Sequence, residues 1–386
     1  MAEGETTAIF FYGSLRDREL TEIVLGRAVA DTALVRASAP GHATRRLAGL
    51  AYPMLRPLAG ARAEGVALLG ASEADLDRLC FFEEAEYGLA PITIETEAGP
   101  VEAQYFLATD KPTTTDLPWD YAAWAKNDRA VALEAARELM LYHDSLAIED
   151  VDTVWPGIMV RARQRARAKA EALPPKGITS GLGREAVEVE RIAHPYTGFL
   201  KVEEYRLRHR RFDGSWSAPV NRTAVLWGDA VTMLPYDPAT DRVLLIEQFR
   251  IPAFARGAPN PWCIEVVAGL LDGDDDPEAT ARREAIEEAG VEIGRTREIG
   301  RYYTSSGLAA EFIVSFLGEA DLSQAGGVHG LAVENEDIRS IVLPLDDALA
   351  AAASGAVNTG PALASLLWLA AHRGEVRTAW GLRRTG

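Results

Sequence analysis

The sequence is poor in cysteine and contains no long apolar run. Only Cys80 and Cys263 occur among its 386 residues. Their wide separation favours two unpaired thiols in the core and a reducing compartment over a disulfide. No apolar stretch approaches the roughly 20 residues that a membrane helix needs, and no signal peptide is apparent. These absences predict a cytoplasmic protein with no membrane partner.

Basic residues are also scarce relative to acidic ones. The 40 lysines and arginines face 57 aspartates and glutamates, which gives a formal net charge of −17. Such a charge favours solubility and argues against broad nucleic-acid binding. A phosphorylated substrate would therefore need metal ions or locally placed arginines. The hydrophobic fraction of 48% and the charged fraction of 25% are typical of soluble globular proteins.

A linker-like run at residues 174–183, PPKGITSGLG, divides the sequence. A chain of this length can form two domains with ample cores. We predict a first domain over residues 1–115, a helical segment with a linker over 116–184, and a second domain over 185–386. Within the segment, residues 118–142 predict one amphipathic helix. Residues 158–173 predict a basic helix that docks on an acidic neighbour rather than on nucleic acid or lipid.

Short apolar runs in the first domain alternate with turn signals. The runs at residues 8–12, 65–70, 90–94 and 101–107 predict strands, and Ser72 is a good N-cap for a short helix over 73–82. This mixture indicates a small β-barrel or a curled mixed sheet with one or two helices.

Two stretches of this domain carry a family resemblance. Residues 10–15, FFYGSL, and residues 76–87, LDRLCFFEEAEY, resemble the two signatures of the gamma-glutamylcyclotransferase-like (AIG2-like) family. The resemblance implies loop amides that hold a substrate carboxylate and a glutamate that acts as general acid and base on the α-amino group. Glu84 stands where the family has glycine, which would crowd the pocket or add a charge. The implied site residues are Tyr12, Gly13, Ser14, Leu15 and Glu83.

Three interpretations of this domain stay open. The first is catalysis by Glu83, and the second is a non-catalytic module that binds something small or pads an interface. In the third, Gly13 only serves a turn and Glu83 is an ordinary surface carboxylate.

In the second domain, a turn followed by a short helix stands out at residues 269–291. Asp276 is a good N-cap, Pro277 suits the first helical position, and Gly290 is a typical C-terminal stop. We expect an apolar flank for close packing, formed by Ala281, Ala285, Ile286 and Ala289.

Acidic side chains share the other face of this helix. Glu284, Glu287 and Glu288 are spaced at i, i+3 and i+4, and Arg283 can pair with only one of them, Glu287 at i+4. Taken alone, the helix is compatible with a solvated acidic face or with a site for a hard divalent cation such as Mg²⁺.

The whole run resembles the Nudix box, G-x5-E-x7-R-E-U-x-E-E-x-G-U, where U is a bulky apolar residue. Asp275 stands at the first Glu of the box, and Ala285 is small for the first U. The resemblance implies an α/β/α sandwich with a mixed sheet, and the order of strand and helix patterns after residue 185 fits it. Together the two domains predict an α/β (α+β) protein with a cyclotransferase-like β-barrel ahead of a Nudix sandwich.

Residues 243–250, 261–269 and 326–338 look like the ADP-ribose pyrophosphatases of the Nudix superfamily. This resemblance implies Mg²⁺-dependent cleavage of ADP-ribose, with Mn²⁺ as an alternative ion. The implied metal ligands are the Ala268 carbonyl, Glu284, Glu288 and Glu336. Glu334 is the implied base, Glu287 a ligand or its support, and Arg283 the group that orients the carboxylates. The implied substrate contacts are Arg250 to phosphate and Glu265, Gly269 and Leu270 to the rest of the substrate.

One departure concerns the substrate. Ser306 stands where ADP-ribose pyrophosphatases usually have a proline, so GDP-mannose or another nucleoside diphosphate sugar is the alternative substrate. A degenerate hydrolase that only senses a nucleotide sugar is the alternative class. The resemblance also implies a homodimer that exchanges N-terminal strands of the Nudix domains. The two-domain combination is similar to a group of tellurite-resistance proteins.

Overall fold

The computed structural model describes residues 7–47, 52–84, 87–108, 114–171, 178–273, 276–331, 333 and 335–380. Contacts within the chain separate two compact units, Met1–Leu173 and Pro174–Gly386. Each unit has its own sheets and its own apolar clusters.

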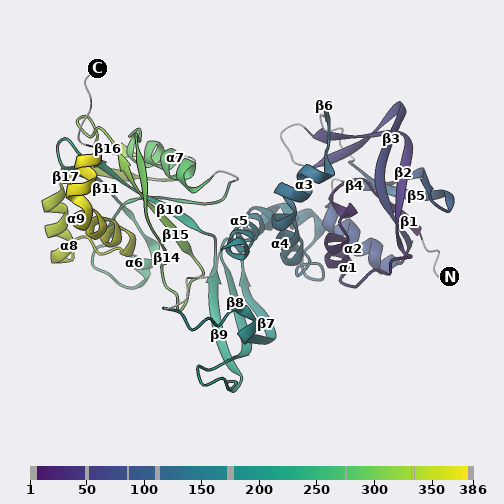
Figure 1. Cartoon of the computed structure of the whole chain (residues 1–386), viewed down its shortest axis with the longest axis horizontal. Coiled ribbons are helices and arrows are strands. Elements are labelled where there is room, and N and C mark those ends of the chain that lie inside the picture. The colour runs from purple at the N-terminus through teal and green to yellow at the C-terminus, as the bar shows by residue number, and fades with distance from the viewer. Residues whose placement is uncertain are drawn as a thin grey trace. The chain divides into compact units, whose positions relative to one another are not determined.

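The N-terminal unit is built on a closed ring of five strands (Figure 1). Going round the ring, β3 pairs with β1, then come β5, β4 and β2, and β2 pairs back with β3. A sixth strand, β6, joins the ring through β2. The predicted small β-barrel is therefore confirmed. The strands are β1 (Thr7–Phe11), β2 (Leu34–Leu47), β3 (Pro53–Ala71), β4 (Tyr87–Thr96), β5 (Gly99–Ala108) and β6 (Thr114–Pro118).

Strand β1 lies between antiparallel β3 and parallel β5. Successive side chains of a strand point to opposite faces, and β1 uses both faces for packing. Ile9 and Phe11 enter an apolar cluster with the helices of the unit, whereas Phe10 and Tyr12 enter a second cluster with residues of the ring. The end of β1 is thus fixed on both sides, and the loop that follows it starts from a rigid support.

Short helices follow β1 and β3. The 3-10 helix η1 (Ser14–Arg16) leads into α1 (Arg18–Leu25), which the sequence did not predict. Asp17 caps α1 by accepting a hydrogen bond from the Leu20 amide at 3.1 Å. Helix α2 (Glu73–Glu83) begins after Ser72 with a reciprocal capping box to Asp75, as the cap signal predicted.

The predicted single helix over residues 118–142 is wrong. The chain forms α3 (Tyr121–Asn127) and α4 (Arg129–Leu139), with a break at Asp128. Asn127 and Asp128 are poor helix formers because their side chains compete for backbone hydrogen bonds. Just past the break, Arg129 donates from Nε to Asp17 Oδ2 at 2.7 Å, so a long-range ion pair fixes the start of α4.

Helix α5 (Val151–Ala170) follows η2 (Ile148–Asp150) and carries the predicted basic stretch. It docks on acidic residues of α4, as expected. Arg161 Nε and Arg165 Nη1 both bond to the Glu138 carboxylate, at 2.8 and 2.6 Å. Lys169 Nζ bonds to Glu134 at 2.5 Å.

The C-terminal unit contains two sheets. After η3 (Arg184–Ala186), three antiparallel strands form a small sheet in chain order, β7 (Val187–Thr197), β8 (Lys201–His209) and β9 (Val220–Leu226). The larger sheet runs β14-β15-β10-β11-β17-β16, with β12 paired to β11 and β13 paired to β10. It is mixed, because β10 and β15 are parallel while the other pairs are antiparallel. Its strands are β10 (Ala230–Asp237), β11 (Arg242–Phe249), β12 (Trp262–Glu265), β13 (Val267–Leu270), β14 (Thr296–Tyr303), β15 (Phe312–Glu319), β16 (Gly327–His329) and β17 (Ile338–Pro344).

Helices cover both faces of the larger sheet (Figure 1). On one face, α7 (Pro277–Ala289) packs its alanines against sheet residues such as Val231. On the other face, α8 (Leu345–Ser354) and α9 (Gly360–Trp380) cover sheet residues such as Leu234. A short helix, α6 (Ile251–Ala255), follows β11. The predicted α/β/α sandwich is therefore confirmed.

Some local predictions need correction. Ile286 is 55% exposed and is not part of the packed flank of α7, because at 3.6 residues per turn it lies about 100° from Ala285. The short strands β12 and β13 are separated at Val266. Cys80 and Cys263 are free, as predicted, but half-buried rather than in the core.

No helix in the described ranges is both long and apolar enough to span a bilayer.

Candidate functional site

Helix α7 begins and ends where its sequence signals predict. Asp276 Oδ1 accepts hydrogen bonds from the amides of Glu278 and Ala279, at 2.9 and 3.1 Å. Gly290 ends the helix in the left-handed region with φ of 66°, where glycine is favoured. These two ends fix which side chains of α7 face the sheet.

Two carboxylates of α7 lie against strand β13. Glu288 is only 3% exposed, and its Oε2 accepts a hydrogen bond from the Ala268 amide at 2.9 Å. Glu284 lies so close to Gly269 that a Cβ there would approach its carboxyl carbon to 2.2 Å. Only glycine at position 269 leaves room for this approach. The helix and the strand thus hold two acidic groups beside each other in a poorly hydrated place.

Arg283 contacts two of the three glutamates. Its Nη1 lies 2.7 Å from Glu287 Oε2, and its Nη2 lies 2.8 Å from Glu284 Oε1. The sequence-based expectation of a pair with Glu287 alone is therefore wrong. Two neighbours on adjacent turns of the helix can share one planar guanidinium, because its donors point in fixed, diverging directions.

The loop before β17 brings a third carboxylate into range. Glu336 Oε2 accepts a hydrogen bond from the Leu331 amide at 3.1 Å. Its negative charge helps to raise the pKa of both Glu284 and Glu288, so it lies near both. The metal-ligand role that the resemblance implies for Glu336 stays a prediction.

The electrostatics of this cluster favour a bound cation. Burial is the main cause that raises the pKa of Glu284 to about 7 and the pKa of Glu288 to about 8. Mutual repulsion adds to both shifts, so a divalent cation would relieve a real electrostatic cost. Within the described ranges, no three Asp, Glu, His or Cys side chains form a complete metal site by themselves. Carbonyl oxygens or water would have to complete the coordination.

The predicted substrate contacts lie at the ends of neighbouring strands. Arg250 Nε donates to Glu265 Oε2 at 2.7 Å, and the positive charge of Arg250 lowers the pKa of Glu288. Gly269 and Leu270 lie on β13, paired with Val231 and Ala230 of β10. Two further predictions, Glu334 as the base and Asp275 at the first Glu of the box, fall outside the described residues.

Sequence reasoning missed Glu311. Burial is the main cause that raises its pKa, while hydrogen bonds from Thr304 and Trp227 and the charge of Arg250 oppose the rise. Glu311 is the last residue of the stretch in which Ser306 replaces the expected proline. That departure was the one feature of the sequence that drew attention to this stretch.

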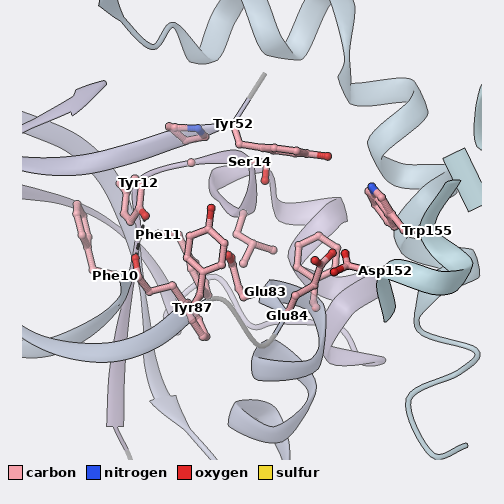
Figure 2. A pocket seen from close by; sticks show the side chains of 15 residues that line it. Phe10, Phe11, Tyr12, Ser14, Tyr52, Glu83, Glu84, Tyr87, Asp152 and Trp155 are labelled. Carbon is pink, nitrogen blue, oxygen red and sulfur yellow. Dashed lines mark hydrogen bonds between the residues drawn. The ribbon is translucent and has the colours of Figure 1, made fainter. Parts of the chain in front are cut away.

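The N-terminal unit contains a cavity of about 320 Å³ (Figure 2). All five residues predicted for this unit line it: Tyr12, Gly13, Ser14, Leu15 and Glu83. In Figure 2, Glu83 lies in the middle of the labelled side chains, with Tyr12 and Tyr87 to its left and Trp155 to its right. The sequence did not predict the other lining residues, which are Phe10, Phe11, Tyr52, Pro53, Phe82, Glu84, Tyr87, Phe106, Asp152 and Trp155.

Hydrogen bonds hold both ends of the loop that lines the cavity, residues 12–15. Tyr12 donates its hydroxyl proton to the Phe106 carbonyl at 2.8 Å, and Thr21 donates to the Leu15 carbonyl at 2.7 Å. Glu83 keeps some accessible surface because it faces the cavity, yet burial raises its pKa to about 7, and the charge of Glu84 adds to the rise. Glu83 therefore titrates near neutral pH, which suits a general acid or base.

The shifted pKa of Glu83 predicts that the N-terminal unit loses stability as the pH rises from about 4.5 to about 7. In the folded unit Glu83 holds its proton up to about pH 7, compared with an ordinary 4.5, so above that window the folded state contains a poorly solvated carboxylate. At about 1.4 kcal/mol per pKa unit, the loss is at most about 3.5 kcal/mol.

Hydrogen exchange of residues 7–25, measured against urea at about pH 5 and about pH 8, checks this. Glu83→Gln should flatten the pH dependence, because it removes the titrating group but keeps the side chain's shape. Equal pH dependence in the wild type and the variant would contradict the assignment.

Comparisons with known proteins fit this division of the chain. The family model described as NUDIX domain matches residues 226–364, and the one described as gamma-glutamyl cyclotransferase, AIG2-like, matches residues 9–126. The ADP-ribose pyrophosphatase of Escherichia coli (strain K12) is 38% identical over 208 residues, which are 54% of this chain and 99% of that protein.

Two further relatives match the same half of the chain. The ADP-ribose pyrophosphatase of Haemophilus influenzae is 35% identical over 187 residues, 48% of this chain and 86% of its own length. The GDP-mannose pyrophosphatase of Citrobacter koseri is 40% identical over 142 residues, 37% of this chain and 73% of its own length. With the carboxylate cluster of α7 in place, the chain belongs to the Nudix hydrolases and carries an AIG2-like domain N-terminal to its Nudix domain.

Proposed function

We propose that the Nudix unit hydrolyses the diphosphate of ADP-ribose to AMP and ribose 5-phosphate in the presence of Mg²⁺ or Mn²⁺. The observation that carries this proposal is the pair of buried carboxylates, Glu284 and Glu288, pressed against Gly269 and its strand. The relatives named ADP-ribose pyrophosphatase support the substrate, because the chain covers 99% of the Escherichia coli protein.

The residues of the cluster divide into groups that hold a cation and groups that position them. Glu284, Glu288, Glu336 and the Ala268 carbonyl would hold the metal, with Glu287 as a further ligand or support. Arg283 keeps two of these carboxylates apart by contacting both Glu284 and Glu287. When bound, the metal neutralises diphosphate charge and lowers the pKa of a coordinated water. Glu334 would take the proton from that water.

Arg250 would hold the diphosphate through an exchange of partners. It is paired with Glu265 at 2.7 Å, and a diphosphate oxygen is a strong competitor for a guanidinium. Release from Arg250 would leave Glu265 free to accept hydrogen bonds from the nucleoside half. Substrate binding would then be coupled to the opening of the Arg250–Glu265 ion pair.

GDP-mannose is the second candidate substrate. The Citrobacter koseri GDP-mannose pyrophosphatase is 40% identical over its matched part, and Ser306 replaces the expected proline in an exposed turn. A nucleotide-sugar sensor without turnover is the alternative class, and a role in tellurite resistance stays a prediction.

We also propose a homodimer through the Nudix units. Exposed apolar side chains of the small sheet, including Val189 and Tyr196, support it, and sedimentation velocity would test it.

A substrate panel tests the activity directly. The full chain with Mg²⁺ should convert ADP-ribose to AMP and ribose 5-phosphate, with a kcat/KM at least about tenfold above that for GDP-mannose, a difference of about 1.4 kcal/mol in transition-state binding. Chromatography of the products measures both rates, and chelation by EDTA should abolish them. A preference for GDP-mannose would favour the second candidate, and no cleavage of any nucleoside diphosphate sugar would reject hydrolysis.

A further inference from the structure

The cavity of the N-terminal unit has one wall that lies outside the matched AIG2-like segment. That segment ends at residue 126, whereas Asp152 and Trp155 come from α5. Figure 2 shows both side chains on the side of the cavity opposite Tyr12. The shape and charge of the cavity therefore depend on a helix that the family segment does not include.

The lining is acidic and aromatic. Among the lining residues that the structure describes are three carboxylates, Glu83, Glu84 and Asp152, and no lysine or arginine. Aromatic rings surround these charges, among them Tyr52, Tyr87 and Trp155. The positive charge of Arg163 acts on Tyr52, which lines the cavity. It lowers the pKa of Tyr52 less than the charge of Glu84 raises it. Negative charge therefore dominates the interior.

Glu84 contributes its charge from an unfavourable backbone conformation. Its φ of 67° and ψ of 173° fall in a region that is essentially reserved for glycine. The AIG2-like signature places glycine at this position, so the usual residue would remove the strain. At this position Glu84 adds a carboxylate to the cavity lining.

Glu83 supplies a second indication of a ligand. It lies deep in the cavity, where surrounding protein raises its pKa. The described part of the chain offers its carboxyl no hydrogen-bond partner. A polar group in such surroundings normally has a partner. Because the Glu83 side chain lines the cavity, a ligand with N–H donors that enters the cavity can reach this carboxyl.

We propose that this cavity binds an aliphatic amine in its ammonium form, with Asp152 and Trp155 of α5 as selectivity residues. The ammonium group would donate to Glu83, Glu84 and Asp152, whose acceptor oxygens match its three N–H donors. Trp155 and the tyrosines would contact the cation through their ring faces and pack on its apolar chain. A cavity of about 320 Å³ has room for a small molecule. This proposal departs from the carboxylate-bearing substrate implied by the family resemblance, and it is independent of the Nudix reaction.

Titration calorimetry of the full chain tests the ligand class. The probes are unbranched α,ω-diamines of four to eight carbons, with 1,5-pentanediol and glutarate as uncharged and anionic partners of matched length. At least one diamine should bind about tenfold or more tightly than the diol, since both charge pairing and cation–π contact are lost with the diol. Tighter binding of glutarate, or no binding of any diamine, would overturn the proposal.

Three substitutions test the residues. Asp152→Asn and Trp155→Leu should each weaken binding of the best diamine about fivefold or more. The exposed Glu149→Gln, on the turn just before α5 and outside the lining, should leave it unchanged. Glu84→Gly should weaken binding yet raise or preserve the melting temperature, because it relieves the strained backbone. Unchanged affinity in both Asp152→Asn and Glu84→Gly, with melting temperatures intact, would exclude the acidic wall from recognition.

Discussion

Glu288→Gln should reduce hydrolysis by about a thousandfold while leaving the fold intact. A carboxylate that holds a catalytic metal contributes several kcal/mol to stabilising the transition state, and each 1.4 kcal/mol corresponds to about tenfold in rate. Glutamine has nearly the same shape, and its carbonyl oxygen can still accept the hydrogen bond from the Ala268 amide. Because burial raises the pKa of Glu288 to about 8, loss of its charge should not destabilise the unit.

The measurement is AMP release from ADP-ribose with Mg²⁺, alongside a thermal melt of each protein. Glu292→Gln is the matched control, because Glu292 lies three residues past the end of α7 and is exposed. A variant that keeps more than about a tenth of the wild-type rate would remove Glu288 from the metal site, since loss of even a supporting group costs about 10- to 100-fold. Retained nucleotide binding without turnover in the wild type would instead favour the sensor.

Glu138→Ala should destabilise the N-terminal unit by about 3–5 kcal/mol. The Glu138 and Arg161 side chains are at most 1% exposed and are paired at 2.8 Å. Arg165 bonds to the second oxygen of the same carboxylate. Removal of Glu138 would leave the Arg161 guanidinium buried without this counter-charge, which costs far more than the pair itself contributes.

Urea unfolding monitored by hydrogen exchange of α4 and α5 measures this effect. Glu95→Ala is the control within the same unit, because its ion pair with Arg62 is about half exposed on both sides and should contribute less than about 1 kcal/mol. Glu138→Leu combined with Arg161→Met should recover much of the loss, since an apolar pair of similar volume needs no counter-charge. A loss below about 1 kcal/mol in Glu138→Ala would show that water reaches the arginines.

Local signals in the sequence predicted the parts of the fold that depend on neighbouring residues. The caps at Asp276 and Gly290 fixed both ends of α7, and Ser72 fixed the start of α2. The break at Asp128 was missed because hydrophobic periodicity continues through it. What holds α4 apart from α3 includes an ion pair with Asp17, more than 100 residues earlier in the chain.

The candidate sites show the same limit. Motif spacing singled out Glu284, Glu288 and the residues Tyr12 to Leu15, and the structure places the two glutamates against β13 and the other four residues in the cavity lining. It could not show that Arg283 contacts two glutamates, because side-chain rotamers decide this. Nor could it place Asp152 and Trp155 in the cavity, since that depends on how α5 packs. Local motifs therefore identify some residues of each site, and tertiary packing brings in the others.

The position of β1 in the ring has a consequence for the kinetics of ligand exchange. Hydrogen bonds to β3 and β5 hold the strand on both sides, and the Thr21 hydroxyl holds the Leu15 carbonyl. The loop is thus ordered before any ligand arrives, and binding loses little conformational entropy. Association should then occur at a rate set by diffusion into the cavity rather than by loop closure, and differences in affinity among ligands should appear in their dissociation rates.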